Sequence, residues 1–497
     1  MDLNNTKKSG EYSQNSQRFL ESFKVSVGDE VRITTSKGEF SGIILPRYET
    51  FSDKYIVLKL KSGYNIGMEI NHIEKIEAKK INSSTNKLKP NQQIQNLSNV
   101  SIPISNQQIS SQSTSKDQIQ IQIQNVFDRI ESKSNSKTLP RILLISTGGT
   151  IASKIDYRTG GVTSLLSASE LYGAFPELEN HGYIYPEFLF NEYSENITPD
   201  HWKIIAERIS QAVTKEQFDG IIISHGTDTL HYTSSALSFA LKNIPIPVIL
   251  VGSQRSSDRP SSDAFSNLVG AIHFIKDSKY AGIFVCMHHN TSDGVIACHL
   301  GTRVRKNHTS KRDAFKSLDS LPFALIDQKG EIKYNDILHK DLVRRKESLK
   351  NFVPRTTFDD KVFLLKFYPG LNPSFLEAFL NLDYKVIIIE GTGLGHINKA
   401  CFHIISKLIN SGIFVFMTSQ CIFGRVQMTV YDTGRDLLGL GVIPLSNMGP
   451  ETAVVKAMWA LHNSSGSSDF IRIMTVNYAD EMPAILPLVS LKSEGEE

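Results

Sequence analysis

Short apolar runs alternate with longer helical patterns through the last two thirds of the chain. Four such runs lie between residues 141 and 288: RILLIS, DGIIIS, PVILVG and GIFVCMH. Runs of this length that are apolar throughout are typical of parallel strands covered by helices on both faces. Three more follow residue 361, namely KVFLLKF, YKVIIIEG and IFVFMTS. The pattern predicts a larger α/β domain over residues 139–350 and a smaller one over residues 351–497.

The first part of the chain has a different pattern. Residues 1–22 are polar and are expected to be flexible. Residues 23–79 contain short β-rich runs broken by Gly, Pro and charged turns, which predicts a small all-β barrel. We expect residues 80–138 to be a disordered linker, because 23 of the 40 residues from 81 to 120 are Ser, Asn or Gln. Such a segment cannot bury enough apolar area to offset the entropy lost on ordering.

Composition narrows the class of protein. A formal net charge of +3 over 497 residues gives no support to a strongly basic nucleic-acid binder. No apolar run reaches the roughly 18 residues that would span a bilayer, and no apolar stretch follows the lysines near the N-terminus, as a signal peptide would require. The four cysteines have no CxxC or zinc spacing. We therefore expect a cytoplasmic protein with reduced thiols and no membrane partner.

Polar residues rich in Thr and Gly follow two of the predicted strands. Thr147 to Thr150 come directly after RILLIS, and the sequence SHGTDTL (224–230) follows the next strand. Ligands of parallel sheets bind beyond the carboxyl ends of the strands. A threonine hydroxyl is a poor nucleophile that needs a base or a positioned charge, and Asp228 and the basic stretch 300–315 offer both. Taken alone, each motif is more often a tight turn or a helix N-cap than a catalytic group.

Other polar motifs point to no cofactor or metal. EGTGLGH (390–396) is rich in glycine after a strand, but it lacks the full GxGxxG spacing of a dinucleotide site. His288, His289 and His299 have no metal-ligand spacing and are expected to be hydrogen-bonded residues at strand ends. We therefore expect no metal site in this chain.

The two Thr-rich motifs together resemble the signature motifs of the bacterial-type L-asparaginase family. TGGTIAS (147–153) and HGTDTL (225–230) stand in the family's order, and similar residues extend over about 140–485. The resemblance implies a two-domain asparaginase-like α/β fold with parallel sheets. It also implies that Thr150 is the nucleophile, assisted by Thr227, Asp228 and a lysine.

The resemblance also suggests the lysine and the substrate-binding residues. Lys306 in GTRVRKNHTS is the best match, and the neighbouring alternatives are Arg303, Arg305 and Lys311. The residues that correspond to the family's site for the substrate α-carboxylate and α-amine are Ser194 and Glu195, in NEYSENITPDHW. Stand-alone asparaginases usually carry Gln where Glu195 stands.

The layout of the chain resembles one branch of this family, the archaeal D subunits of glutamyl-tRNA(Gln) amidotransferase. About 140 residues precede TGGT, and DYRTGGV follows it. The resemblance implies that the chain releases ammonia from glutamine or asparagine and has no cofactor of its own. An E-type partner would form a heterodimer or a dimer of heterodimers with it, hold most of the tRNA(Gln) and use ATP and Mg²⁺.

Two alternatives remain open. The chain could be a free-standing cytoplasmic L-asparaginase whose N-terminal module is irrelevant to catalysis. It could also be a non-catalytic scaffold with a binding barrel. A scaffold predicts decay of the Thr/Thr/Asp set, yet Thr150, Thr227 and Asp228 are all present.

Overall fold

The structure is a computed structural model of the whole chain. It describes the following residues: 14–35, 38–45, 54–60, 65–78, 139–149, 153–155, 162–164, 176–255, 262–292, 294–335 and 349–482. The predicted linker, residues 80–138, and residues 1–13 of the predicted flexible N-terminus lie outside these ranges. The rest of that N-terminus, expected to be flexible, instead forms a helix over Gln14–Ser22, because Leu20 packs into the core of the N-terminal unit. In the described part of the chain, no helix combines the length and the apolar character needed to cross a membrane.

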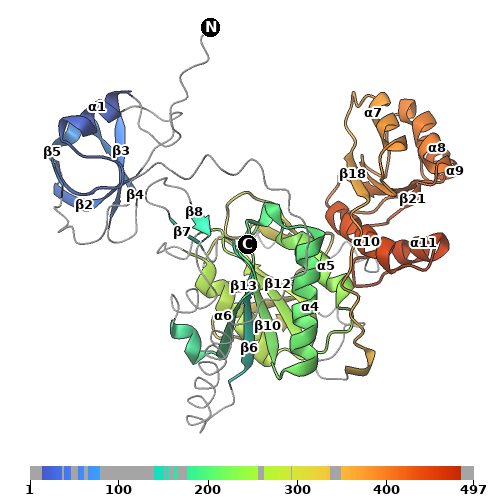
Figure 1. Cartoon of the computed structure of the whole chain (residues 1–497), viewed down its shortest axis with the longest axis horizontal. Helices are drawn as coiled ribbons and strands as arrows, with labels where there is room; N and C mark the ends of the chain where they lie inside the picture. Colours follow the sequence, from blue (N-terminus) through green and yellow to red (C-terminus); the bar gives the residue numbers. More distant parts are fainter. Residues whose placement is uncertain are drawn as a thin grey trace, which may run out of the picture.

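The N-terminal unit is a five-stranded antiparallel sheet in the order β4-β3-β2-β1-β5, packed with one helix (Figure 1). Its elements are α1 (Gln14–Ser22), β1 (Glu30–Thr35), β2 (Gly38–Leu45), β3 (Tyr55–Leu60), β4 (Asn65–Glu69), η1 (Ile70–His72) and β5 (Ile73–Ala78). Alternate residues of β1 and β3 are buried, among them Val31, Ile33, Ile56 and Leu58. This alternation encloses a small core of its own, which also takes in Leu20 of α1.

The larger α/β domain is built on a mixed sheet of eight strands in the order β17-β16-β13-β12-β11-β10-β6-β9. The parallel strands are β6 (Arg141–Ser146), β9 (Tyr183–Phe188), β10 (Gly220–Ser224), β11 (Pro247–Val251) and β12 (Gly282–His288). The antiparallel strands are β13 (Val295–Leu300), β16 (Ala324–Asp327) and β17 (Ile332–Tyr334). The apolar runs predicted β6, β10, β11 and β12. They did not predict β9, which is only partly buried at the edge of the sheet, or the antiparallel extension.

Helices cover both faces of this sheet, which explains why its strands are apolar throughout. The helices are α4 (Pro199–Lys215), α5 (Leu230–Ala240) and α6 (Ala264–Asp277). Ile142 and Leu144 of β6 lie in a core with α6, whereas Leu143 and Ile145 lie in a second core with α4 and α5. Complete burial of one such side chain contributes about 1.5–3 kcal/mol, so both faces of the strand stabilise the sheet.

Shorter elements complete the larger domain. Two small hairpins are formed by β7 (Ser153–Ile155) with β8 (Val162–Ser164) and by β14 (Val304–Lys306) with β15 (Phe315–Ser317). The 3₁₀ turns are η3 (Pro176–Asn180), η4 (Ser194–Asn196) and η6 (Leu349–Asn351).

The smaller domain has a four-stranded parallel sheet in the order β18-β19-β20-β21. Its strands are β18 (Val362–Lys366), β19 (Val386–Gly391), β20 (Phe414–Ser419) and β21 (Ile443–Pro444). Its helices are α7 (Ser374–Glu377), η7 (Ala378–Leu380), η8 (Lys399–Cys401), α8 (Phe402–Asn410), α9 (Asp432–Leu440), α10 (Pro450–Asn463) and α11 (Ser467–Thr475).

Helix α10 joins the two α/β domains. It packs on the smaller sheet and shares an apolar core with α4 and α5 of the larger domain. Within that core the rings of Phe239 on α5 and Trp459 on α10 stack with their centroids 5.9 Å apart. The shared core holds the smaller domain against the helices that cover the larger sheet.

Candidate active site

The ends of β6 and β10 lie side by side because the two strands pair in parallel register. Ser146 is the partner of Ser224 in this pairing. Beyond it, the backbone N–H and the hydroxyl of Thr147 both donate to the Ser224 carbonyl oxygen, at 3.2 and 2.9 Å. The two Thr-rich motifs, which are far apart in the sequence, therefore meet at one point on the carboxyl edge of the sheet.

The glycines after Thr147 allow the first motif to approach the second. Gly148 and Gly149 have φ values of +105° and +85°, which residues with a side chain rarely adopt. A Cβ on Gly149 would lie 2.2 Å from the backbone nitrogen of Gly226, so no other residue fits there without displacing the second motif. Thr150, the expected nucleophile, follows directly in the sequence but lies outside the described residues.

Lys306 contacts both polar residues of the second motif. Its ammonium group donates to Thr227 Oγ1 at 2.8 Å and to Asp228 Oδ1 at 2.7 Å. Thr227 is buried and the Lys306 side chain is only 10% exposed, whereas the Asp228 side chain is 68% exposed. The three residues form one hydrogen-bonded cluster whose carboxylate end is open to solvent.

The other basic candidates lie elsewhere. Arg305 Nε lies 3.0 Å from Glu451 Oε1 at the start of α10. The Arg303 guanidinium is buried and donates through Nη1 to the carbonyl oxygens of Asn447, at 2.7 Å, and Glu481, at 3.1 Å. Both arginines therefore bind the C-terminal part of the chain. Lys311 is exposed on the loop between β14 and β15.

The short hairpin β14–β15 explains this division. Successive side chains of a strand point to opposite faces. Val304, which lies in the core of the larger domain, and Lys306 share one face of β14. Arg305 lies between them on the opposite face. The alternation of side chains along β14 thus turns Lys306, and not Arg305, toward the second motif.

The two expected substrate-binding residues lie on the turn η4. Ser194 is buried, and a Cβ added at Gly226 would lie 2.7 Å from the Ser194 Cβ, so the turn packs directly on the second motif. Thr229 Oγ1 strengthens this contact by donating to the Ser194 carbonyl oxygen at 2.5 Å. Glu195 follows in the same turn and is exposed. A polar pair, one member buried and one exposed, therefore adjoins the cluster.

Two buried histidines, His225 and His231, lie within and next to the second motif. Nδ1 of His225 contacts the Gly226 carbonyl oxygen at 2.7 Å, and Nε2 contacts Thr233 Oγ1 at 2.9 Å. Burial lowers the pKa of His225 to about 4. Burial, reinforced by the cations of β14, lowers the pKa of His231 to about 3. Both rings are therefore neutral at neutral pH. Their position within and next to HGTDTL was the signal available in the sequence.

This arrangement suits acyl transfer. An amine that bridges a hydroxyl and a carboxylate can carry a proton to or from a neighbouring nucleophile. Backbone N–H groups at the glycine turn could stabilise an oxyanion. Over the described ranges, no group of three or more His, Cys, Asp or Glu side chains is placed to hold a metal ion.

Three family models match the chain. Residues 141–338 match the model described as Asparaginase, N-terminal, and residues 361–474 match the Glutaminase/Asparaginase C-terminal domain. Residues 25–78 match the GatD N-terminal domain. The three matches coincide with the larger α/β domain, the smaller α/β domain and the antiparallel unit.

Relatives cover nearly the whole chain. The D subunit of glutamyl-tRNA(Gln) amidotransferase from Pyrococcus abyssi is 41% identical over 468 residues, covering 93% of this chain and 96% of the relative. The protein of the same name from Methanopyrus kandleri is 39% identical over 475 residues and covers 95% of each chain. Similarity at this level over both chains confirms the resemblance to the D-subunit branch.

Solved structures of similar fold are L-asparaginases. The thermostable enzyme from Thermococcus kodakarensis is 34% identical with a TM-score of 0.60, and the match covers 69% of this chain and 99% of that one. L-asparaginase I from Vibrio cholerae is 26% identical with a TM-score of 0.58, and covers 69% and 100%. These matches confirm the predicted two-domain asparaginase-like fold.

The close approach at Gly149 can be tested with a matched glycine. Gly149→Ala and Gly370→Ala both place a Cβ at positive φ, but a Cβ on Gly370 meets nothing within 4 Å. We expect Gly149→Ala to lower the free energy of unfolding by about 1–3 kcal/mol more than Gly370→Ala, the usual cost of overpacking. Denaturant titration of the two variants measures the difference. Equal losses would show that the motifs do not depend on this contact.

Proposed function

The chain belongs to the family of glutamyl-tRNA(Gln) amidotransferase D subunits, and from this premise we propose that it releases ammonia from glutamine or asparagine for the conversion of Glu-tRNA(Gln) to Gln-tRNA(Gln). The observation that carries the proposal is the position of the Lys306 ammonium, 2.8 Å from Thr227 Oγ1 and 2.7 Å from Asp228 Oδ1. This cluster follows the strand end against which Thr147 and Gly149 pack.

In the proposed reaction, the Thr150 hydroxyl oxygen attacks the carbon of the side-chain amide. The hydroxyl proton passes through the cluster of Thr227, Lys306 and Asp228 to the departing nitrogen. The C–N bond breaks, ammonia leaves, and an ester forms on Thr150. Water then hydrolyses the ester, which releases glutamate or aspartate and restores the hydroxyl.

Ser194 and Glu195 are proposed to hold the other end of the substrate. A carboxylate such as Glu195 suits the α-amine of a free amino acid, and the Ser194 hydroxyl suits its α-carboxylate. The contact of Ser194 with Gly226 of the second motif supports this assignment, and Glu195 follows Ser194 in the same turn. A bound amino acid would then present its side-chain amide to the strand ends.

The acceptor reaction is assigned to a partner. We propose that an E-type partner chain binds most of the tRNA(Gln) and uses ATP and Mg²⁺ to activate the glutamyl γ-carboxylate, and that this chain itself needs no cofactor. Ammonia is lost to water unless its source lies against the acceptor, so the two chains form a heterodimer or a dimer of heterodimers. The coverage of the D-subunit relatives, which includes the antiparallel unit, supports a role within a complex.

A free-standing L-asparaginase is the second candidate function. The solved asparaginases support it, because whole chains of that name match the two α/β domains. They match only 69% of this chain, however, whereas the D-subunit relatives match 93% or more. A non-catalytic scaffold is disfavoured by the intact contacts among Thr227, Asp228 and Lys306.

The nucleophile is tested by Thr150→Ala, with Thr150→Ser as the matched variant that keeps a hydroxyl. We expect Thr150→Ala to abolish ammonia release from glutamine and asparagine, since no ester can form, and Thr150→Ser to retain part of it. Circular dichroism establishes that both variants fold. A folded Thr150→Ala protein with near-normal activity would refute the mechanism.

The lysine is tested by comparing Lys306→Met with Lys311→Met. Loss of an acid–base group costs on the order of 10² in rate, so we expect Lys306→Met to lower kcat for ammonia release by at least that factor. Lys311 is exposed, and its replacement should leave kcat within about twofold, because exposed charges contribute little. The opposite ranking would mean that another residue serves the site.

The role in the complex is tested by omitting components. We expect weak glutaminase activity from the chain alone and a rise when the E-type partner and Glu-tRNA(Gln) are added, because assembly completes or closes the site. Deletion of residues 1–78 should reduce Gln-tRNA formation strongly. It should affect the folding of the α/β domains less, because these domains have their own cores. Ammonia and Gln-tRNA are measured together. Full asparagine hydrolysis that ignores partner and tRNA would favour the free-standing enzyme.

A further inference from the structure

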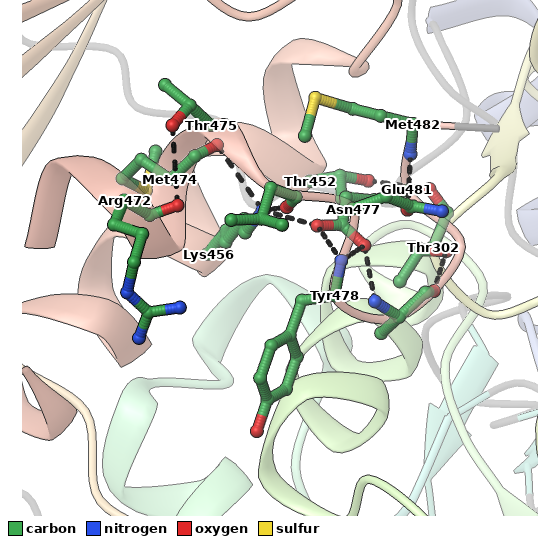
Figure 2. Close-up of polar contacts among 12 residues, drawn as sticks. Thr302, Thr452, Lys456, Arg472, Met474, Thr475, Asn477, Tyr478, Glu481 and Met482 are labelled. Carbon is green, nitrogen blue, oxygen red and sulfur yellow. Dashed lines mark hydrogen bonds and ion pairs between the residues drawn. The ribbon is translucent and has the colours of Figure 1, made fainter. Parts of the chain in front are cut away.

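A fully buried ion pair lies outside the candidate site. Lys456 on α10 donates to a carboxylate oxygen of Glu481, and both side chains are 0% exposed (Figure 2). Taking two charges out of water costs several kcal/mol per ion, unless further hydrogen bonds compensate. A buried pair of this kind therefore needs further hydrogen-bond partners for both charged groups.

Backbone groups of the last described segment supply these partners. We call residues 476–482 the C-terminal hook. The Lys456 ammonium also donates to the carbonyl oxygens of Met474, at 3.3 Å, and Val476, at 2.6 Å. The Glu481 carboxylate accepts from the backbone N–H groups of Tyr478, at 2.9 Å, and Ala479, at 2.6 Å. The ion pair thus holds the hook in a tight bend (Figure 2).

The bent hook in turn binds the larger domain. Thr302 Oγ1 donates to the Ala479 carbonyl oxygen at 2.8 Å, and Arg303 Nη1 donates to the Glu481 carbonyl oxygen at 3.1 Å. On the other side, Thr452 Oγ1 of α10 donates to the Thr302 carbonyl oxygen at 3.0 Å. Two consecutive residues are therefore held by the hook and by the helix that carries Lys456.

These two residues lead directly into β14. Arg303 precedes Val304, the first residue of the strand, and Lys306 is its last. A strand of three residues forms few backbone hydrogen bonds with its partner strand, so its position depends on the contacts at its ends. The hairpin partner β15 aligns one side, and the hook holds the residues at its start.

A purely stabilising role explains this arrangement poorly. Apolar residues of similar volume often stabilise a protein as well as a buried ion pair does. Ion pairs and backbone hydrogen bonds depend on the relative orientation of their partners, which apolar contacts do not. They therefore fix the bend in one geometry. The hook also lies beyond residues 361–474, the part that matches the Glutaminase/Asparaginase C-terminal domain.

We propose that Lys456 and Glu481 are positioning residues, which through the C-terminal hook and residues 302–303 place the Lys306 ammonium against Thr227 and Asp228. The inference rests on the proposed amide hydrolysis for its kinetic consequence. Its structural consequence, the ordering of β14, does not depend on any activity.

Hydrogen–deuterium exchange of the full chain tests the structural consequence. Glu481→Gln removes the charge of the pair, and Thr302→Val removes one hook contact while leaving the pair intact. We expect exchange in residues 301–306 to rise at least about tenfold in both variants, because exchange reports local opening and both variants lose a hydrogen bond that holds the hook. The control is Arg472→Ala, which breaks an exposed pair with Asp469 on the neighbouring α11.

Kinetics test the functional consequence. A misplaced Lys306 weakens the chemical step but not substrate binding, so we expect kcat for ammonia release to fall at least about tenfold, with KM within about twofold. Ile405→Ala is the second control, because it opens a cavity in the smaller domain's core and destabilises without touching the hook. It should leave kcat unchanged in the folded protein.

The outcomes separate the two proposals. Unchanged exchange in residues 301–306 of both folded hook variants overturns the positioning role, whatever the activity. Increased exchange with unchanged kcat also overturns it, as does an equal fall of kcat in Ile405→Ala. If the wild-type chain releases no ammonia, alone or with partner and tRNA, increased exchange in the hook variants still supports the ordering of β14, and the proposed function is refuted instead.

Discussion

The parallel pairing of β6 with β10 is the constraint on which the site depends. Ser146 and Ser224 are partners in this pairing, so the segments that follow them leave the sheet at the same edge. The Thr147 hydroxyl and backbone N–H both donate hydrogen bonds to the Ser224 carbonyl oxygen, and Gly149 lies against Gly226. A shift of one residue in this register would turn every side chain of β6 to the opposite face and separate the two motifs.

The cation of the site reaches this edge by a longer route. After β12, the chain returns antiparallel through β13 and then forms β14, which ends in Lys306. Val304 anchors one face of β14 in the core of the larger domain, while Arg303 and Arg305 bind the smaller domain and the segment after it. The position of Lys306 therefore depends on both domains, although its two partners, Thr227 and Asp228, belong to the larger one.

The two ion-pair environments differ in what they contribute. Lys306 and Asp228 form a pair whose carboxylate is open to solvent. Lys456 and Glu481 form a pair closed to solvent, and backbone carbonyl and N–H groups supply their remaining hydrogen bonds. Burial lowers the pKa of Lys456, and the Glu481 carboxylate opposes that change. The open pair suits chemistry, and the closed pair suits a fixed geometry.

The sequence by itself determined the strands that are buried on both faces, the helices that cover them and the place of each Thr-rich motif, because burial on both faces leaves a local apolar pattern that can be read without the fold. It also placed Thr227 next to Asp228. The family resemblance favoured Lys306, but composition and periodicity did not separate it from Arg303, Arg305 and Lys311, which are chemically similar. Only the tertiary structure brings Lys306 against Thr227 and Asp228, because the four basic residues differ in the face or loop they occupy. The antiparallel strands and the contact of Glu481 with Arg303 likewise depend on packing between distant segments, which short-range periodicity does not record.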